Sequence, residues 1–138
     1  MKDITPADKR LVDEARRVAK RFSLVKWKGQ SLSCVGAALR TKNGKIYSGP
    51  NIEHPDSGPS SMCAEYSALA KAFSEGHKEV AVIVAYFYGG QGDHHVVSPC
   101  GRCREFLRLF GNPEVIINIS GDLKKIKLDA LHPFSKNW

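Results

Sequence analysis

Three of the four cysteines lie in two short segments that together could bind a metal ion. Cys63 belongs to the first segment, and Cys100 and Cys103 form a Cys-x-x-Cys pair in the second. A catalytic zinc usually takes three protein ligands and leaves its fourth position to water, whereas a structural zinc takes four protein ligands. The three cysteines therefore predict a zinc site that activates water.

Two alternatives would use the same cysteines. Cys34 could complete a structural zinc site, and a Cys-x-x-Cys pair alone is also a redox motif. However, Cys34 opens an apolar run that is typical of a strand, and the chain lacks the second closely spaced ligand pair that is usual in structural zinc folds. Catalytic zinc is the interpretation that the pattern favours.

Glu65, two residues after Cys63, is the residue that could turn a metal site into a catalyst. A carboxylate beside metal-activated water can accept its proton and pass it to the substrate as a general acid and base. Taken alone, a glutamate in the first turn of a helix is more often an exposed residue favoured by the helix dipole. Its position beside three candidate ligands favours the catalytic role.

Both halves of the site are predicted to begin helices. Ser98 and Pro99 are typical of an N-cap followed by a first-turn proline, which places Cys100 and Cys103 one turn apart on the same face. A Ser-Ser pair likewise precedes the alanine- and leucine-rich run 62–73. Thiolates at a helix N-terminus are stabilised by free backbone N–H groups and by the helix dipole. We therefore expect both helix N-termini to point at the metal.

The remaining elements predict one domain over residues 1–138, a usual size for a single hydrophobic core. Thr5 and Pro6 begin a helix whose apolar residues form one stripe for the core, namely Leu11, Ala15, Val18 and Phe22. Four apolar runs predict strands, at residues 34–41, 46–49, 80–88 and 114–119. An Asn-Gly turn joins the first two as a hairpin.

Basic residues are concentrated in the N-terminal third of the chain. Residues 1–45 hold twelve Lys or Arg against four Asp or Glu, whereas the rest hold nine against ten, and the net charge is +7. A basic face could attract nucleic acid, so a non-catalytic zinc protein that binds nucleic acid is a remote alternative. No basic loop with interleaved aromatic residues supports stacking of a single strand, and we expect a solvated helix face without a nucleic-acid partner.

Membrane insertion and secretion find no support in the sequence. No apolar run approaches the ~18 residues needed to span a membrane, and the N-terminus lacks the apolar core of a signal peptide. Zinc thiolates must stay reduced, and four cysteines do not suggest a disulfide framework. We therefore expect a cytoplasmic protein.

The segment Cys63-Ala64-Glu65, followed further along the chain by Pro-Cys-x-x-Cys, resembles the zinc-dependent cytidine deaminases that act on free nucleosides, a family that includes the blasticidin S deaminases. Residues 35–39, 44–47 and 51–53 also match the family pattern, so that the resemblance covers roughly residues 33–134. It implies a three-layer α/β/α domain with a mixed sheet of about five strands. It also implies one Zn2+ per subunit and a homotetramer or homodimer.

The implied reaction is the hydrolytic deamination of cytidine or deoxycytidine to uridine or deoxyuridine, a step of pyrimidine salvage, with Glu65 as general acid and base. Asn51 and Glu53 match the family residues that bind the sugar hydroxyls. Backbone groups near Ala64 and Ser98 match those that recognise the base edge. The alternative keeps this chemistry and applies it to blasticidin S or another modified aminopyrimidine nucleoside.

Two departures from the family pattern bear on the substrate. Ser33 stands where the family commonly has a phenylalanine that faces the base, and the proline- and serine-rich segment 54–61 is absent from the usual cytidine deaminase. Both suggest a modified nucleoside, while the retained Asn51 and Glu53 favour a plain one.

Further departures from the family pattern concern the charge of the zinc site and the residue that completes the substrate pocket. Tyr66 stands where many members have an arginine that offsets the charge of the three thiolates. Arg102, between the two later cysteines, is the candidate replacement, and a plain surface arginine is equally consistent with its position. The C-terminal aromatic residue that can complete a neighbouring subunit's pocket in the family corresponds to Phe134 or Trp138.

Overall fold

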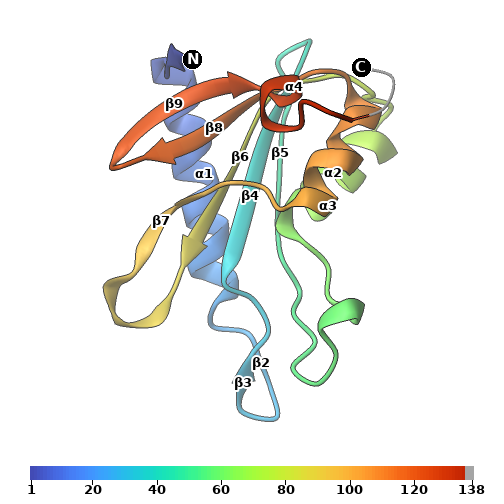
Figure 1. The fold of residues 1–138 in the computed structure, drawn as a ribbon. Coiled ribbons are helices and arrows are strands. Elements are labelled where there is room, and N and C mark those ends of the chain that lie inside the picture. The colour runs from blue at the N-terminus through green and yellow to red at the C-terminus, as the bar shows by residue number, and fades with distance from the viewer. Residues whose placement is uncertain (136–138) are drawn as a thin grey trace.

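A mixed β-sheet forms the middle layer of the molecule (Figure 1). The computed structural model describes residues 1–135, and within them the sheet has seven strands, in the order β1-β9-β8-β6-β4-β5 with β7 paired to β6. Their bounds are Lys2–Asp3 (β1), Val35–Thr41 (β4), Ile46–Pro50 (β5), Val80–Tyr88 (β6), His94–Val97 (β7), Glu114–Ile119 (β8) and Asp122–Lys127 (β9). The β6–β8 pair is parallel and the other pairs are antiparallel, so the predicted mixed sheet is confirmed.

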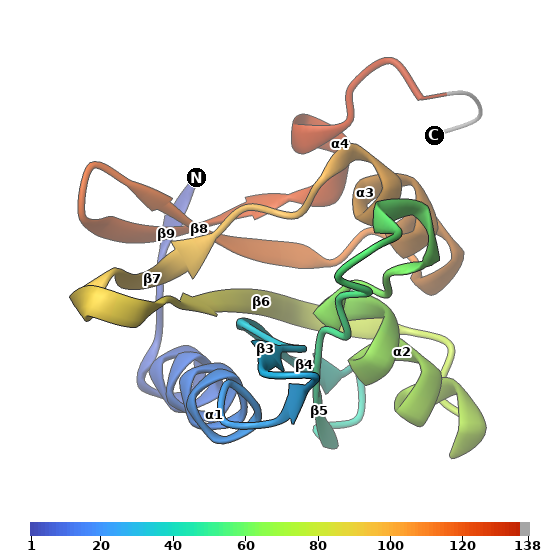
Figure 2. The same cartoon turned by 90° about the horizontal axis from the view of Figure 1, so that it is seen from below.

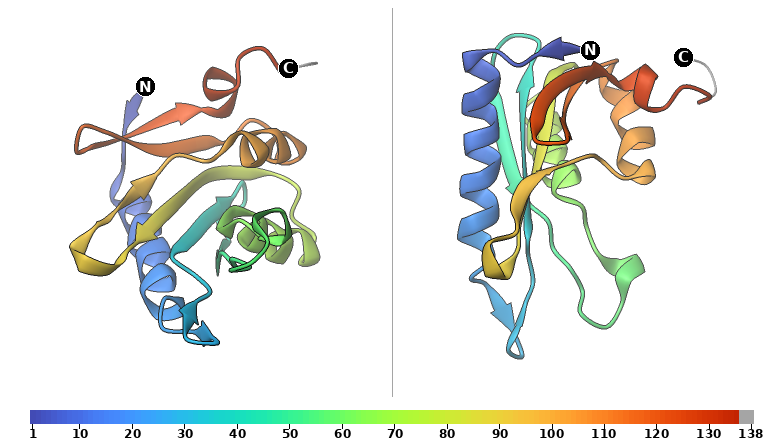
Figure 3. Two further views of the ribbon diagram at one scale, coloured as in Figure 1. Left: turned by 60° about the horizontal axis from the view of Figure 1, so that its bottom comes forward. Right: turned by 60° about the vertical axis from the view of Figure 1, so that its left-hand side comes forward.

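Helices cover both faces of this sheet (Figure 3). Helix α1 (Pro6–Phe22) packs on one face, and α2 (Ala64–Ser74) and α3 (Gly101–Leu107) pack on the other. Each face has its own buried core, with Leu11 and Ala15 on the α1 side and Leu69 and Leu107 on the opposite side. The three-layer α/β/α architecture predicted from the family resemblance is confirmed.

The remaining elements are short, namely β2 (Lys26–Trp27), β3 (Gln30–Ser31), α4 (Leu128–Leu131) and the 3-10 turns η1 (Gly58–Ser60), η2 (Gly90–Gly92) and η3 (Arg108–Phe110). None of the helices in residues 1–135 is long and apolar enough to cross a membrane. The β2–β3 hairpin and the loop that carries η1 project from the same end of the molecule (Figure 1 and Figure 2). Trp27 and His54 bring them into contact, with ring centroids 6.0 Å apart.

The predicted β-hairpin and the first helix are present. Strands β4 and β5 pair through the Asn-Gly turn, where Gly44 adopts a φ of 91°. Thr5 caps α1 through a capping box with Asp8. Gly36 in β4 allows α1 to approach the sheet closely, because a Cβ atom there would clash with the backbone of Ala15 and Ala19.

Asp8 links three elements from a fully buried position on α1. Its carboxylate accepts hydrogen bonds from Arg40 Nη2 at 2.9 Å and Lys125 Nζ at 2.8 Å. Burial acts to raise the pKa of Asp8, but the hydrogen bonds from Lys125, Thr5 and Arg40 together hold the pKa well below its ordinary value. The buried carboxylate therefore stabilises the fold in its ionised form.

We expect Asp8→Asn to lower the free energy of unfolding at pH 7 by about 3 kcal/mol, because it removes the charged partner of Arg40 and leaves Lys125 with only the more distant Glu114, at 3.8 Å. Because the folded-state pKa is depressed, this contribution is complete above the unfolded pKa of about 3.9 and is lost as the pH falls toward the folded pKa. Urea unfolding at pH 7, 5 and 3 would measure it, with the exposed Asp13→Asn as control. A difference between wild type and Asp8→Asn that stays constant down to pH 3 would contradict the assignment.

Candidate active site

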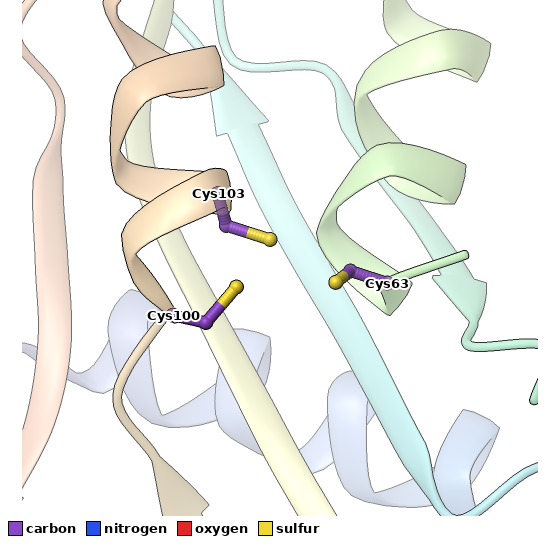
Figure 4. A group of neighbouring side chains, drawn as sticks. All are labelled: Cys63, Cys100 and Cys103. Carbon is purple, nitrogen blue, oxygen red and sulfur yellow. The ribbon is translucent and has the colours of Figure 1, made fainter. Parts of the chain in front are cut away.

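The three predicted zinc ligands meet between the N-termini of α2 and α3 (Figure 4). Cys63 is the N-cap of α2, Cys100 is the N-cap of α3, and Cys103 follows within the first turn of α3. Their Sγ atoms all lie within 4.8 Å of one another. Thiolates bound tetrahedrally to one zinc at ~2.3 Å lie roughly 3.8 Å apart. The three side chains therefore fit a zinc ion.

Both helices begin later than the sequence predicted. Cys100, and not Ser98, is the N-cap of α3, since the backbone stays extended through Cys100 and becomes helical only at Gly101. The N-cap prediction for Ser98 is therefore wrong. Cys63 likewise caps α2, whose first residue is Ala64. A cysteine at the cap position brings its sulfur next to the free backbone N–H groups of the first turn.

The thiols differ in their electrostatic surroundings. Burial raises the pKa values of Cys63 and Cys103, and at Cys103 the nearby Glu65 carboxylate raises the pKa further. Burial acts upward at Cys100 too, but hydrogen bonds that include those from the backbone N–H groups of Cys103 and Arg102 bring the pKa of Cys100 below its ordinary value. Three neighbouring thiols can ionise together only beside a cation, and a divalent zinc ion provides that charge.

Glu65 lies beside the cysteine cluster with only 6% of its surface exposed. Burial raises the pKa of Glu65, while its own backbone N–H and the Cys103 thiol act in the opposite direction. A carboxyl group whose pKa is raised toward neutrality can both accept and return a proton. The structure thus places a carboxyl group that can transfer protons next to the three predicted zinc ligands.

One cavity of about 230 Å3 collects the predicted catalytic, metal-binding and substrate-binding residues. They are Glu65, Cys63, Cys100, Cys103, Asn51, Glu53, Ala64 and Ser98. Val35 and Val97, which the sequence did not single out, complete the wall. A larger depression of about 510 Å3 lies elsewhere, beside Phe73 and Leu109, but its lining is almost entirely apolar. The smaller cavity is therefore the one with the groups for chemistry.

Asn51, which lines the same cavity, is held in one orientation. Its Oδ1 atom accepts hydrogen bonds from Ser33 Oγ and from the backbone N–H groups of Cys34 and Val35, each at 2.9 Å. The amide oxygen is committed, and Nδ2 donates one hydrogen to Cys34 Sγ at 3.9 Å. The second Nδ2 hydrogen remains as a donor for a ligand, while Glu53 presents carboxylate oxygens as acceptors. A donor beside an acceptor suits a ligand with hydroxyl groups. Nothing in the residue types near Ser33 and Cys34 signals these contacts.

Two of the predicted site residues that the structure describes, Arg102 and Phe134, do not line this cavity. Arg102 is exposed and contacts Tyr66, to whose Oη atom its Nε donates at 3.1 Å. Phe134 is 99% exposed and does not line the cavity of its own chain. Trp138 lies outside the described residues.

Comparisons with known proteins give a consistent result. The family described as "Cytidine and deoxycytidylate deaminase zinc-binding region" matches residues 6–119. Blasticidin-S deaminase of Bacillus cereus is 41% identical over 105 residues, which span 72% of this chain and 74% of that protein. Cytidine deaminase of Sporosarcina psychrophila is 37% identical over 107 residues, spanning 74% and 75% respectively. The crystal structure of cytidine deaminase from Burkholderia pseudomallei has a TM-score of 0.65 at 29% identity and covers 89% of this chain and 97% of that one.

A buried carboxylate next to three convergent thiols supports hydrolysis by activated water, so the fold and the site define a zinc-dependent hydrolase. The chain belongs to the cytidine and deoxycytidylate deaminase family, and the resemblance predicted from the motifs is confirmed. It is therefore an enzyme that hydrolyses C–N bonds of cyclic amidines. Membership of this family argues against the non-catalytic zinc protein considered above.

Proposed function

We propose that the enzyme converts cytidine and deoxycytidine to uridine and deoxyuridine with release of ammonia, as a step of pyrimidine salvage. The observation that supports this proposal most directly is the single cavity lined by Glu65, the three thiols, Asn51 and Glu53. The carboxyl group and the thiols suit the chemistry at the base, and Asn51 and Glu53 suit the sugar hydroxyls. The similarity to a cytidine deaminase over about three quarters of both chains supports this substrate.

The proposed mechanism uses each residue of the cavity. Cys63, Cys100 and Cys103 would hold one Zn2+ per subunit, which when bound supplies the Lewis acidity that makes water a nucleophile near neutral pH. Glu65 accepts a proton from the attacking water as the water oxygen bonds to C4 of the cytosine ring. Glu65 then delivers this proton to N3, takes the proton of the new C4 hydroxyl group and passes it to the amino group, and the C4–N bond breaks to release ammonia and leave a carbonyl at C4.

Binding of the substrate would involve the remaining polar groups. Backbone groups of Ala64 and Ser98 would hold the edge of the base. The Asn51 Nδ2 donor and the Glu53 carboxylate would hold the sugar hydroxyls.

Asn51→Asp keeps the oxygen that accepts the bonds from Ser33, Cys34 and Val35 and removes the Nδ2 donor. It is expected to lower kcat/KM for cytidine about tenfold, mainly through KM, because a hydrogen bond to the sugar is lost in both the ground and transition states. With 2′,3′-dideoxycytidine, which lacks both hydroxyls, the substitution should change kcat/KM less than about twofold. Steady-state kinetics with both nucleosides would measure the difference. Equal losses with the two substrates would remove Asn51 from sugar recognition.

A modified aminopyrimidine nucleoside such as blasticidin S is the second candidate substrate. The similarity to a blasticidin-S deaminase favours it, and so does a neighbouring depression. This depression, of about 180 Å3, is lined by Trp27, His54 and Pro55 and shares Glu53 with the catalytic cavity. It leaves room for a substituent beyond the sugar.

Ammonia release with mass analysis of the product would decide between the substrates. The panel is cytidine, deoxycytidine, cytosine, blasticidin S, adenosine and guanine, each with zinc-loaded protein. Turnover of cytidine and deoxycytidine supports the proposal, whereas turnover of blasticidin S alone favours the second candidate. If none of the six compounds released ammonia, the result would contradict both candidate substrates.

We further propose a cytoplasmic homotetramer, or a homodimer. The reduced thiolates require a reducing compartment.

Two observations support assembly. Phe73 and Leu109 are 59% and 72% exposed beside the apolar depression, and exposed apolar surface of this kind often marks an interface. Phe134 is almost fully exposed on a C-terminal segment that a hydrogen bond from Arg104 Nη1 to the Leu131 carbonyl holds at 2.8 Å. In an assembly Phe134 could complete a neighbouring cavity, and analytical ultracentrifugation would give the mass.

A further inference from the structure

The two helices that carry the cysteine ligands are joined by an aromatic contact next to the thiols. Tyr66 follows Glu65 in α2, and its ring stacks on Phe106 of α3 with centroids 4.2 Å apart and planes at 27°. Phe106 lies three residues after Cys103, on the same side of its helix. The stack therefore spans the same gap between helices as the three sulfur atoms.

Tyr66 also fixes the position of Arg102. The guanidinium carbon lies 4.7 Å from the centroid of the Tyr66 ring, a cation–π contact, and Nε donates a hydrogen bond to Oη at 3.1 Å. Arginine stacks readily on aromatic rings. Without such contacts an exposed arginine side chain samples many rotamers. Tyr66 thus holds in one place a cation that stands between Cys100 and Cys103 in the sequence.

A positive charge held in one place would change the electrostatics of the metal site. Three thiolates and one Zn2+ carry a formal charge of −1, which weakens the metal as a Lewis acid. The charge of a mobile, solvated guanidinium is screened by salt and water. The guanidinium of Arg102 is held on the Tyr66 ring, and that ring itself joins the two helices that carry the thiols.

We propose that Tyr66 is a positioning residue that holds Arg102 beside the ligand helices, where the guanidinium offsets the negative charge of the three thiolates. This inference rests on the proposed zinc-dependent function. Tyr66 acts through its hydroxyl, which orients the guanidinium, and through its ring, which joins α2 to α3. Tyr66→Phe removes the first contribution and keeps the second.

A double-mutant cycle on zinc affinity tests the proposal. The zinc dissociation constants of wild type, Tyr66→Phe, Arg102→Gln and the double variant would be measured by competition with a chromophoric chelator. Tyr66→Phe is expected to weaken zinc binding roughly three- to tenfold, the effect of one hydrogen bond to the cation. In the Arg102→Gln background the same change should have no further effect, because Tyr66 then has no cation to position.

The matched control is Arg108→Gln, which removes an arginine six residues further along the chain and should leave zinc affinity unchanged. Additive effects of Tyr66→Phe and Arg102→Gln would overturn the proposal, because they would assign Tyr66 a role independent of Arg102. An unchanged affinity in Tyr66→Phe would overturn it as well. Zinc affinity is measured without substrate, so coupling without ammonia release would support this inference and refute only the proposed reaction.

Discussion

Replacing Glu65 with glutamine is expected to lower kcat for the substrate by about a thousandfold or more while zinc stays bound. Glutamine keeps the size of the side chain but cannot accept a proton from water at neutral pH. General acid and base catalysis by one residue contributes roughly 10² to 10⁴ in rate, and Glu65 would serve both the attack and the departure of ammonia. Ammonia release and zinc content would be measured on the same preparation.

Glu75→Gln is the matched control, since Glu75 is an exposed glutamate at the opposite end of α2. This variant should keep full activity. Loss of zinc from Glu65→Gln would mean that Glu65 supports the metal site and not the proton transfer. Retained activity would remove Glu65 from the mechanism.

The ligands and Glu65 could be predicted from the sequence because their chemistry restricts both residue type and spacing. A Cys-x-x-Cys pair at a helix start brings two sulfurs to one face, so the spacing of Cys100 and Cys103, together with Cys63 and Glu65, predicts a metal site. The cavity that holds them with Asn51 and Glu53 is consistent with the family resemblance.

Contacts between distant segments left no comparable signal. The bond between Ser33 and Asn51 joins positions 18 residues apart, and that between Arg102 and Tyr66 joins positions 36 residues apart. Each depends on how the sheet and the helices pack. For the same reason three strands of the sheet escaped prediction: β1 has only two residues, β7 has four, and β9 is rich in charged residues.

Replacing Cys103 with alanine is expected to weaken zinc binding at least about a hundredfold and to abolish activity at stoichiometric zinc. Removal even of groups that only support the ligands costs about 10- to 100-fold in affinity, and Cys103 is itself one of three. Because Cys103 is only 1% exposed, we expect no group from the solvent-exposed surface to replace its thiolate as a ligand. Chelator competition would give the affinity, and added zinc should raise the thermal stability of wild type but not of this variant.

The variant Cys34→Ser tests whether the zinc site is catalytic, with three thiolate ligands, or structural, with four. Within residues 1–135, Cys63, Cys100 and Cys103 form the one cluster of three or more potential metal ligands. Cys34 instead contacts Glu53, to whose Oε1 atom its thiol donates at 3.7 Å. Cys34→Ser should therefore keep wild-type zinc affinity. Loss of zinc in this variant would make Cys34 a fourth ligand, and a closed site of four thiolates would leave no position for the water that Glu65 is proposed to deprotonate.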